Sequence, residues 1–199
     1  MLQSKINGFG FGPSGYTKQK LLDFCAFCGI RTDTTYYSTS VDGYTFIMMG
    51  TEACSSNHPL ITDTRLKWLD AELTKAAATG KPVFVVCHEP LNNRHGRWYA
   101  AGVGEEVYGK SNDILLQHAN PAAPVIMLSG HIHSQNERSF EKGAEGLYFL
   151  SVPGFLFGYN QSYEADGFVA EIYPHESYFR LRNFTDNVFF PEFEYSIHY

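Results

Sequence analysis

Short runs of apolar residues alternate along the chain with segments whose apolar residues recur at helical spacing. Two runs of strand length, 81–87 and 124–129, are bounded by Pro or Gly, which is typical of buried strands. Paired strands are predicted at 34–41 and 44–49, because Asp42-Gly43 between them favours a hairpin turn. Further strands are predicted at 146–152, 167–173 and 178–184, and the aromatic tail at 188–199 is expected to pack along an edge.

Apolar residues at helical spacing predict helices between these strands. The clearest helix starts at Thr62 or Asp63, ends at Gly80 and buries one face made of Leu66, Leu69, Leu73 and Ala76. Other helices are predicted at 17–28 and 112–118. Loops are predicted at 51–60, 89–110 and 153–166, and a flexible Gly-rich arm at 1–15. The length suits a single domain over residues 1–199.

The charge balance narrows the possible partners. The chain has 15 Lys and Arg against 21 Asp and Glu, so its net charge is 15 − 21 = −6. A mildly acidic chain without a basic stripe predicts that nucleic acid is not a partner. No apolar run approaches the roughly 20 residues that span a bilayer, so no membrane partner is expected. The first five residues lack the apolar region of a signal peptide, and the compartment is left open because the chain resembles only part of a known domain.

The cysteines allow two interpretations. Cys25 and Cys28 have the spacing of a redox pair, but Leu21, Cys25 and Cys28 also fall on one face of the predicted helix. The second pattern favours buried core thiols, because no strand–helix–strand context precedes the pair. Cys87 lies within a predicted buried strand and is expected to act as a small hydrophobic residue.

Histidines follow both of the buried apolar runs. His88 comes directly after the first run, and His131 and His133 follow the second run after Gly130. Residues i and i+2 of an extended chain point to the same side, so His131 and His133 can face one place. A lone histidine at a strand end is most simply a hydrogen-bonded structural residue. Three of them at two strand ends predict a metal site.

Two blocks of sequence resemble those of the calcineurin-like metallophosphoesterases. Gly130-His131-Ile132-His133 is similar to the Gly-His-x-His motif of that family, and 85–91 is similar to its preceding block of hydrophobic strand, His, x and Pro. The helical pattern around Trp68 is also similar. The resemblance implies an α/β fold, a mixed-sheet sandwich flanked by helices. It further implies that His88 and His131 bind one metal and His133 a second.

Three motifs of that family do not occur in this sequence. They are Asp-x-His, Gly-Asp-x-x-Asp and Gly-Asn-His followed by Asp or Glu; Asn57-His58 is only a distant echo of the third. The chain therefore resembles the C-terminal two-thirds of such a domain and is expected to be N-terminally incomplete. Three neutral imidazoles without a bridging carboxylate predict at most one weakly held divalent metal of the Zn, Mn or Fe type. We expect phosphoester hydrolysis that is impaired; the alternative is a non-catalytic fragment that binds a metal or a partner.

The predicted loop at 89–110 contains candidates for substrate contact. Arg94 and Arg97 can pair with phosphate oxygens, and Asn92 lies two residues earlier. His95 is either an acid–base group or a solvated side chain. The resemblance implies a phosphoester substrate, either a small molecule or a phosphoprotein. A Ser-His-Asp hydrolase is disfavoured, because Ser14 and Ser129 lack the Gly-x-Ser-x-Gly context.

A homo-oligomer is also expected. If strands of the missing motifs belong beside those ending at His88 and Gly130, their absence exposes an apolar edge with unpaired backbone groups. A dimer or higher oligomer that covers this edge is the predicted outcome.

Overall fold

The computed structural model describes residues 18–50, 54–55, 58–59, 61–88, 90, 105–130, 140–154 and 165–199. Its helices are α2 (Lys18–Phe27), α3 (Asp63–Ala77) and α4 (Glu105–Gln117). Its strands are β1 (Tyr37–Val41), β2 (Tyr44–Met49), β3 (Cys54–Ser55), β4 (His58–Pro59), β5 (Val83–Cys87), β6 (Val125–Ser129), β7 (Phe140–Ala144), β8 (Leu147–Ser151), β9 (Asp166–Tyr173), β10 (Glu176–Asn183) and β11 (Val188–His198).

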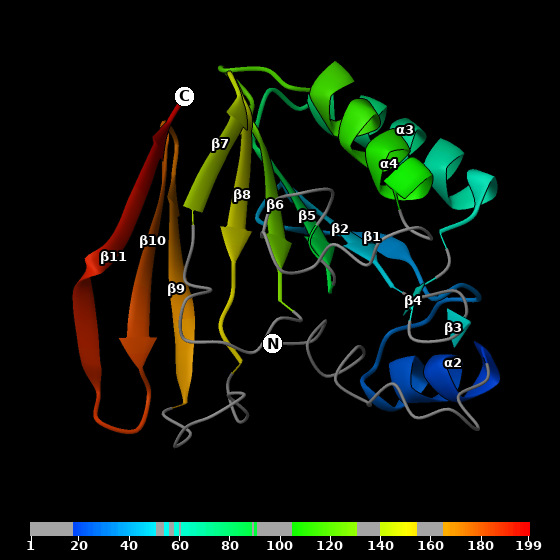
Figure 1. The fold of residues 1–199 in the computed structure, drawn as a ribbon, viewed down its shortest axis with the longest axis horizontal. Helices are drawn as coiled ribbons and strands as arrows, with labels where there is room; N and C mark the ends of the chain where they lie inside the picture. Colours follow the sequence, from blue (N-terminus) through cyan, green and yellow to red (C-terminus); the bar gives the residue numbers. More distant parts are fainter. Residues whose placement is uncertain are drawn as a thin grey trace.

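A six-stranded mixed sheet forms the centre of the molecule, with the order β1-β2-β5-β6-β8-β7. Strands β2, β5, β6 and β8 are parallel, and the short strands β1 and β7 pair antiparallel at the two edges. Figure 1 shows α3 and α4 on one side of this sheet and a second sheet, β11-β10-β9, on the other side. The predicted mixed-sheet sandwich flanked by helices is confirmed.

Alternation along the strands explains why both faces of the central sheet are covered. Val85 and Met127 point toward the helices and pack with Leu69, whereas Phe84 and Ile126 point the other way and pack with Phe179 of β10. Each of these six residues except Phe179 belongs to an apolar run or helical face recognised in the sequence. Burial on both faces is what the continuous apolar character of the parallel strands predicts.

Several predicted boundaries are wrong. Helix α4 begins at Glu105 rather than at 112, so the predicted loop at 89–110 ends earlier than expected. Strand β7 was not predicted, because its sequence Phe-Glu-Lys-Gly-Ala carries only a weak strand pattern. The tail 188–199 is not merely packed along an edge but forms strand β11, paired with β10. Within the predicted loop at 51–60, β3 and β4 form a two-residue ladder.

The expected unpaired edge beside the histidine-bearing strands is also wrong. Strand β5 lies between β2 and β6, and β6 lies between β5 and β8, so both of their sides are hydrogen-bonded. The hairpin strand β2 and the later strand β8 fill the places that were expected to be empty.

Burial tests the predictions made for the cysteines. Cys25 is fully buried in α2 and Cys87 is buried in β5, which confirms both as core residues, whereas Cys28 is only half-buried. Burial raises the pKa of the Cys25 thiol, and Cys28 raises it further, so Cys25 is a weak nucleophile at neutral pH. Trp68 lies at the edge of α3, where its ring centroid is 4.7 Å from that of Tyr36.

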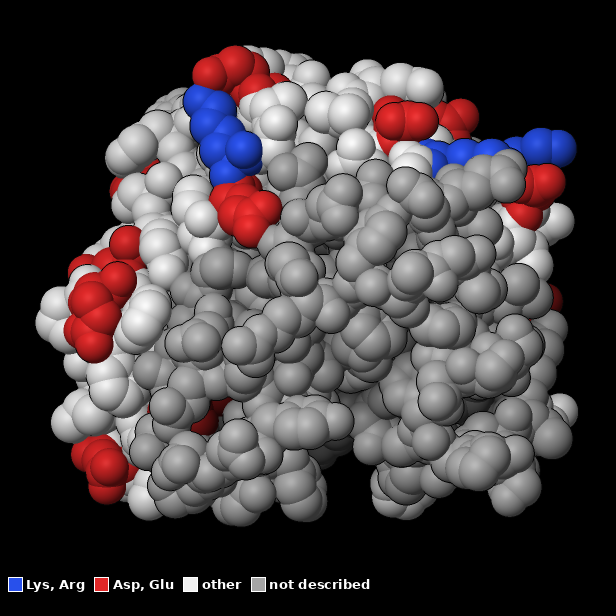
Figure 2. All heavy atoms as spheres, in the orientation of Figure 1, with Lys and Arg blue, Asp and Glu red and all other residues white. Residues whose placement is uncertain are grey.

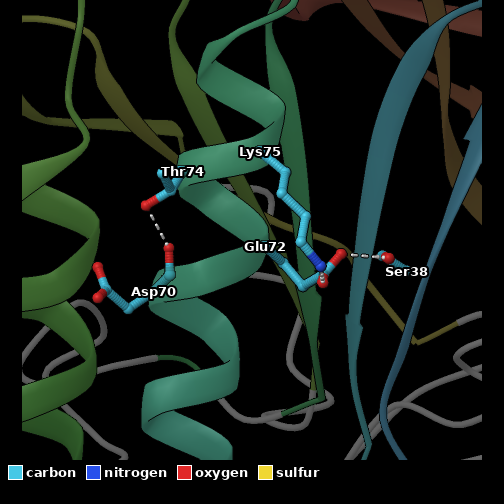
Figure 3. A network of polar contacts seen from close by, with 5 residues as sticks. All are labelled: Ser38, Asp70, Glu72, Thr74 and Lys75. Atoms are coloured by element: carbon cyan, nitrogen blue, oxygen red, sulfur yellow. Dashed lines mark hydrogen bonds and ion pairs between the residues drawn. The ribbon is translucent and has the colours of Figure 1, made fainter.

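Glu72 links helix α3 to the edge strand β1 (Figure 3). Its carboxylate accepts hydrogen bonds from Lys75 at 2.6 Å and from Ser38 of β1 at 2.5 Å. Burial pushes the pKa of Glu72 upward, but the hydrogen bonds from Lys75 and Ser38 together outweigh it and lower the pKa. The charged form is therefore favoured in the folded protein.

Replacing Glu72 with glutamine is expected to reduce stability in a pH-dependent way. Because the folded pKa is lowered, the stabilisation is present above the unfolded pKa and is lost as pH falls through the folded value. Glu72→Gln should lower the free energy of unfolding by about 1 kcal/mol at pH 7 and by much less at acidic pH. Urea unfolding at pH 7 and pH 3.5 measures this difference. Glu145→Gln, in an exposed pair with Lys142, serves as the control, and an equal loss at both pH values in Glu72→Gln would contradict the prediction.

Candidate functional site

The carboxyl ends of four parallel strands meet at one edge of the central sheet. Met49 of β2 lies opposite Cys87 of β5, and Ser129 of β6 lies opposite Ser151 of β8. The next residues along these strands are Gly50, His88, Gly130 and Val152. This edge is where α/β sheets bind their ligands. The arrows of β6 and β8 in Figure 1 point toward the same end of the molecule.

His88 and Gly130 are joined at this edge. The backbone N–H of Gly130 donates to the carbonyl oxygen of His88 at 2.9 Å. A Cβ atom placed on Gly130 would lie 4.0 Å from Nδ1 of the His88 imidazole. The half-buried ring of His88 therefore lies against the residue that immediately precedes His131. The two strand ends therefore lie side by side, and the meeting of the three imidazoles stays a prediction.

The remaining predicted site residues lie outside the described part of the chain. These are the other two metal-ligand candidates, His131 and His133, and the four loop candidates, Asn92, Arg94, His95 and Arg97. Within the described ranges, no group of three or more His, Cys, Asp or Glu side chains is placed to hold a metal ion. The roles of all seven residues, including the metal-binding role of His88, stay predictions.

Two residues that the sequence did not single out fix the neighbouring strand end. Arg65 is 1% exposed, and its Nη2 donates to the carbonyl oxygen of Met49 at 3.0 Å. Gly50 lies against Thr35, because a Cβ atom on Gly50 would be 1.7 Å from the Thr35 carbonyl oxygen. Arg65 lies on the same buried face of α3 as Leu69. These contacts hold the end of β2 next to His88.

His118 contacts an aspartate of a neighbouring helix and is not part of the proposed site. It lies just beyond the end of α4, and its Nε2 is 2.7 Å from Oδ1 of Asp70 on α3. Its side chain is 16% exposed and links the two helices. His118 is thus the example of a hydrogen-bonded structural histidine in this chain.

The charges on the face shown in Figure 2 are interspersed. The described Lys and Arg side chains lie in two separate places, each beside acidic side chains, and do not form a continuous stripe there. Among the described helices, none combines the length and apolarity needed to cross a bilayer.

Comparison with known proteins identifies the architecture. A dimetal phosphatase from Danio rerio superposes with a TM-score of 0.68 at 13% identity, over 92% of this chain and 68% of that chain. The chain has a metallophosphoesterase-like fold. A predicted phosphoesterase from Streptococcus pneumoniae TIGR4 also matches, with 13% identity, a TM-score of 0.35 and coverage of 67% of this chain and 88% of that chain. No family model and no curated protein matches the sequence.

Within this metallophosphoesterase-like fold, the strands that precede His88 and Gly130 lie side by side. Strand β5, which leads to His88, and strand β6, which leads to Gly130, are adjacent and parallel, and they meet at their carboxyl ends, where α/β sheets generally bind ligands. At 13% identity, the structural likeness concerns the fold, so the chemistry must be argued from the residues.

Proposed function

We propose that this chain is a calcineurin-like, metal-dependent phosphoesterase with impaired activity. The observation that carries the proposal is the contact between His88 and Gly130, which brings the His88 imidazole beside the start of the Gly-His-x-His segment. The fold supports it, because the structure it resembles is that of a dimetal phosphatase. The three proposed ligands are His88, His131 and His133.

The donor set fits one divalent ion. Neutral imidazole nitrogens suit Zn, and also Mn or Fe, and three of them leave a coordination position for water. Such an ion would supply a water of lowered pKa as the nucleophile for phosphoester hydrolysis. The role of the protein is to hold the imidazoles in place. The hydrogen bond from the Gly130 N–H to the His88 carbonyl oxygen fixes the two strand ends relative to each other.

Impairment follows from the ligands that the sequence lacks. Without the motifs Asp-x-His, Gly-Asp-x-x-Asp and Gly-Asn-His, no carboxylate from these motifs can bridge two cations or offset their charge. We therefore expect one weakly held metal and slow turnover. The substrate is a phosphoester, in a small molecule or a phosphoprotein. Arg94, Arg97 and Asn92 would contact its phosphate, and His95 would be the candidate acid–base group.

Hydrolysis of p-nitrophenyl phosphate and bis(p-nitrophenyl) phosphate tests the proposal. Purified chain should show slow hydrolysis that requires added Zn²⁺, Mn²⁺ or Fe²⁺ and is abolished by a chelator. His131→Ala should reduce the rate to that of buffer with metal, and His118→Ala should retain it, because His118 contacts Asp70 instead of the proposed site. Hydrolysis that His131→Ala leaves unchanged would contradict the assignment. Metal binding without any hydrolysis would favour the alternative, a non-catalytic fragment that binds a metal or a partner.

A further inference from the structure

Among the described residues, strand β9 forms one edge of the three-stranded sheet. In the described part of the chain, β9 pairs only with β10, and its eight residues pair without a register shift from Tyr173 to Asp166. Every second residue of such a strand directs its N–H and C=O groups away from its single partner. The segment has no Lys, Arg or Pro, and its charged residues are Asp166 at one end and Glu171.

The other edges of the six-stranded and three-stranded sheets carry more of the features that prevent pairing. Strand β11 contains Pro191 with Glu192, and its pairing with β10 is interrupted by a register shift. Strand β7 is five residues long, contains Lys142 and also has a register shift. Strand β1 is five residues long, mostly polar and exposed. The contrast makes β9 the edge best suited to accept a further strand.

The side chains of β9 are self-complementary. Phe168 and Ile172 pack with the core cluster between the sheets, so the side chains of odd number on this strand face outward. On the outer face, Tyr173 is 49% exposed at one end of the strand. At the other end the 42% exposed ring of Phe184 covers Gly167, with Cε2 at 3.2 Å from the position of a Cβ atom.

We propose that two copies of this chain pair antiparallel along β9 and join their three-stranded sheets into one. A two-fold axis perpendicular to the sheet, through the exposed Ala170, places residues of the same face opposite each other. Phe168 then lies opposite the partner's Ile172, an aromatic–β-branched pair. Gly167 lies opposite the partner's Tyr173, which meets the exposed ring of Phe184. The two-fold pairing thus covers the exposed side chains of both Tyr173 and Phe184.

The charges along the edge permit this pairing. Glu171 is the acidic residue in the middle of β9, and it accepts a hydrogen bond from Arg180 of the same copy at 2.7 Å. In the proposed register, Glu171 lies opposite the partner's Val169, so the two acidic side chains do not oppose each other directly. The buried Asp166 lies beyond the paired centre and bonds with Asn183 of its own copy.

Sedimentation over a range of concentrations, combined with two variants, tests the proposal. Wild-type chain should be a dimer, and Tyr173→Glu should weaken dimerisation at least about tenfold, because it places a charge against the partner's Phe184. Val41→Glu, at an exposed apolar position of edge strand β1, is the matched control and should leave the dimer intact. Ala170→Cys should form a disulfide between the two copies under mild oxidation, because opposed residues of a hydrogen-bonded pair lie about 5.5 Å apart at Cα.

Three outcomes would overturn the proposal. The first is a wild-type chain that is a monomer at all concentrations. This holds also if the β9 amides of that monomer resist hydrogen exchange because another segment of the same chain covers them. The second is a dimer that Tyr173→Glu and Val41→Glu affect equally. The third is a dimer in which Ala170→Cys cross-links no better than the native cysteines of the wild type. The dimer test does not depend on hydrolysis. Failure of the proposed phosphoesterase function can therefore be distinguished from failure of the proposed dimer.

Discussion

Gly50→Ala is expected to be among the most destabilising single substitutions in the chain. A Cβ atom at this position would lie 1.7 Å from the carbonyl oxygen of Thr35 and 2.8 Å from its carbonyl carbon. Both are backbone atoms, so the contact cannot be relieved by a side-chain rotation. The end of β2 or the segment at Thr35 must move, which we expect to lower the free energy of unfolding by about 3 kcal/mol or more.

Urea unfolding measures this effect, and two other glycines provide controls. A Cβ atom on Gly130 would meet its nearest atom, the Val152 carbonyl oxygen, at 3.7 Å, so Gly130→Ala should change the free energy of unfolding by less than about 1 kcal/mol. Gly109 lies within α4 with nothing within 4 Å of that position, so Gly109→Ala should stabilise by about 0.5–1 kcal/mol. A Gly50→Ala variant as stable as the wild type would show that the strand end is not fixed against Thr35.

His88→Ala is expected to have the largest effect on the site. Under the proposed function, it removes one of three imidazole ligands, and the two that remain follow a different strand. We expect the affinity for Zn²⁺ to fall at least about 100-fold, which isothermal titration calorimetry can measure. His118→Ala is the matched control, because it removes an imidazole that contacts Asp70. Equal Zn²⁺ affinity in wild type and His88→Ala would remove His88 from the ligand set.

The sequence was most informative where burial decides the structure. The apolar runs at 81–87 and 124–129 became β5 and β6, and the helical face around Leu69 became the buried side of α3. Asp42 and Gly43 adopt positive φ values of 51° and 79°, which is the hairpin conformation that their residue types predict. In each case one local pattern was sufficient, because no long-range competitor contradicted it.

The prediction failed where tertiary contacts override local pattern. Strand β7 has Lys142 and Gly143 within five residues, and only its pairing with β8 makes it a strand. The buried Arg65 would ordinarily be assigned to the surface, since its interior position depends on the carbonyl oxygen of Met49. The exposed edge was expected beside His88 because the place of β8 in the sheet order could not be derived from its sequence.

For the candidate site, the sequence identified the strand ends and the structure added the contact between them. His88 lies beside Gly130 because β5 and β6 are neighbours in the sheet order. Local sequence gave no information on that order. It also could not indicate Gly50, whose close approach to Thr35 arises between segments 15 residues apart by number, 50 − 35.

The most direct test of the account is to observe the imidazoles themselves during metal addition. The chain contains eight histidines, and their ring nitrogens can be followed by ¹H–¹⁵N NMR with assignments from single His→Ala variants. With one equivalent of Zn²⁺, the signals of His88, His131 and His133 should change together, while that of His118, bound to Asp70, should not move. A His88 signal that stays unchanged while His131 and His133 respond would contradict the claim that the two strand ends build one metal site.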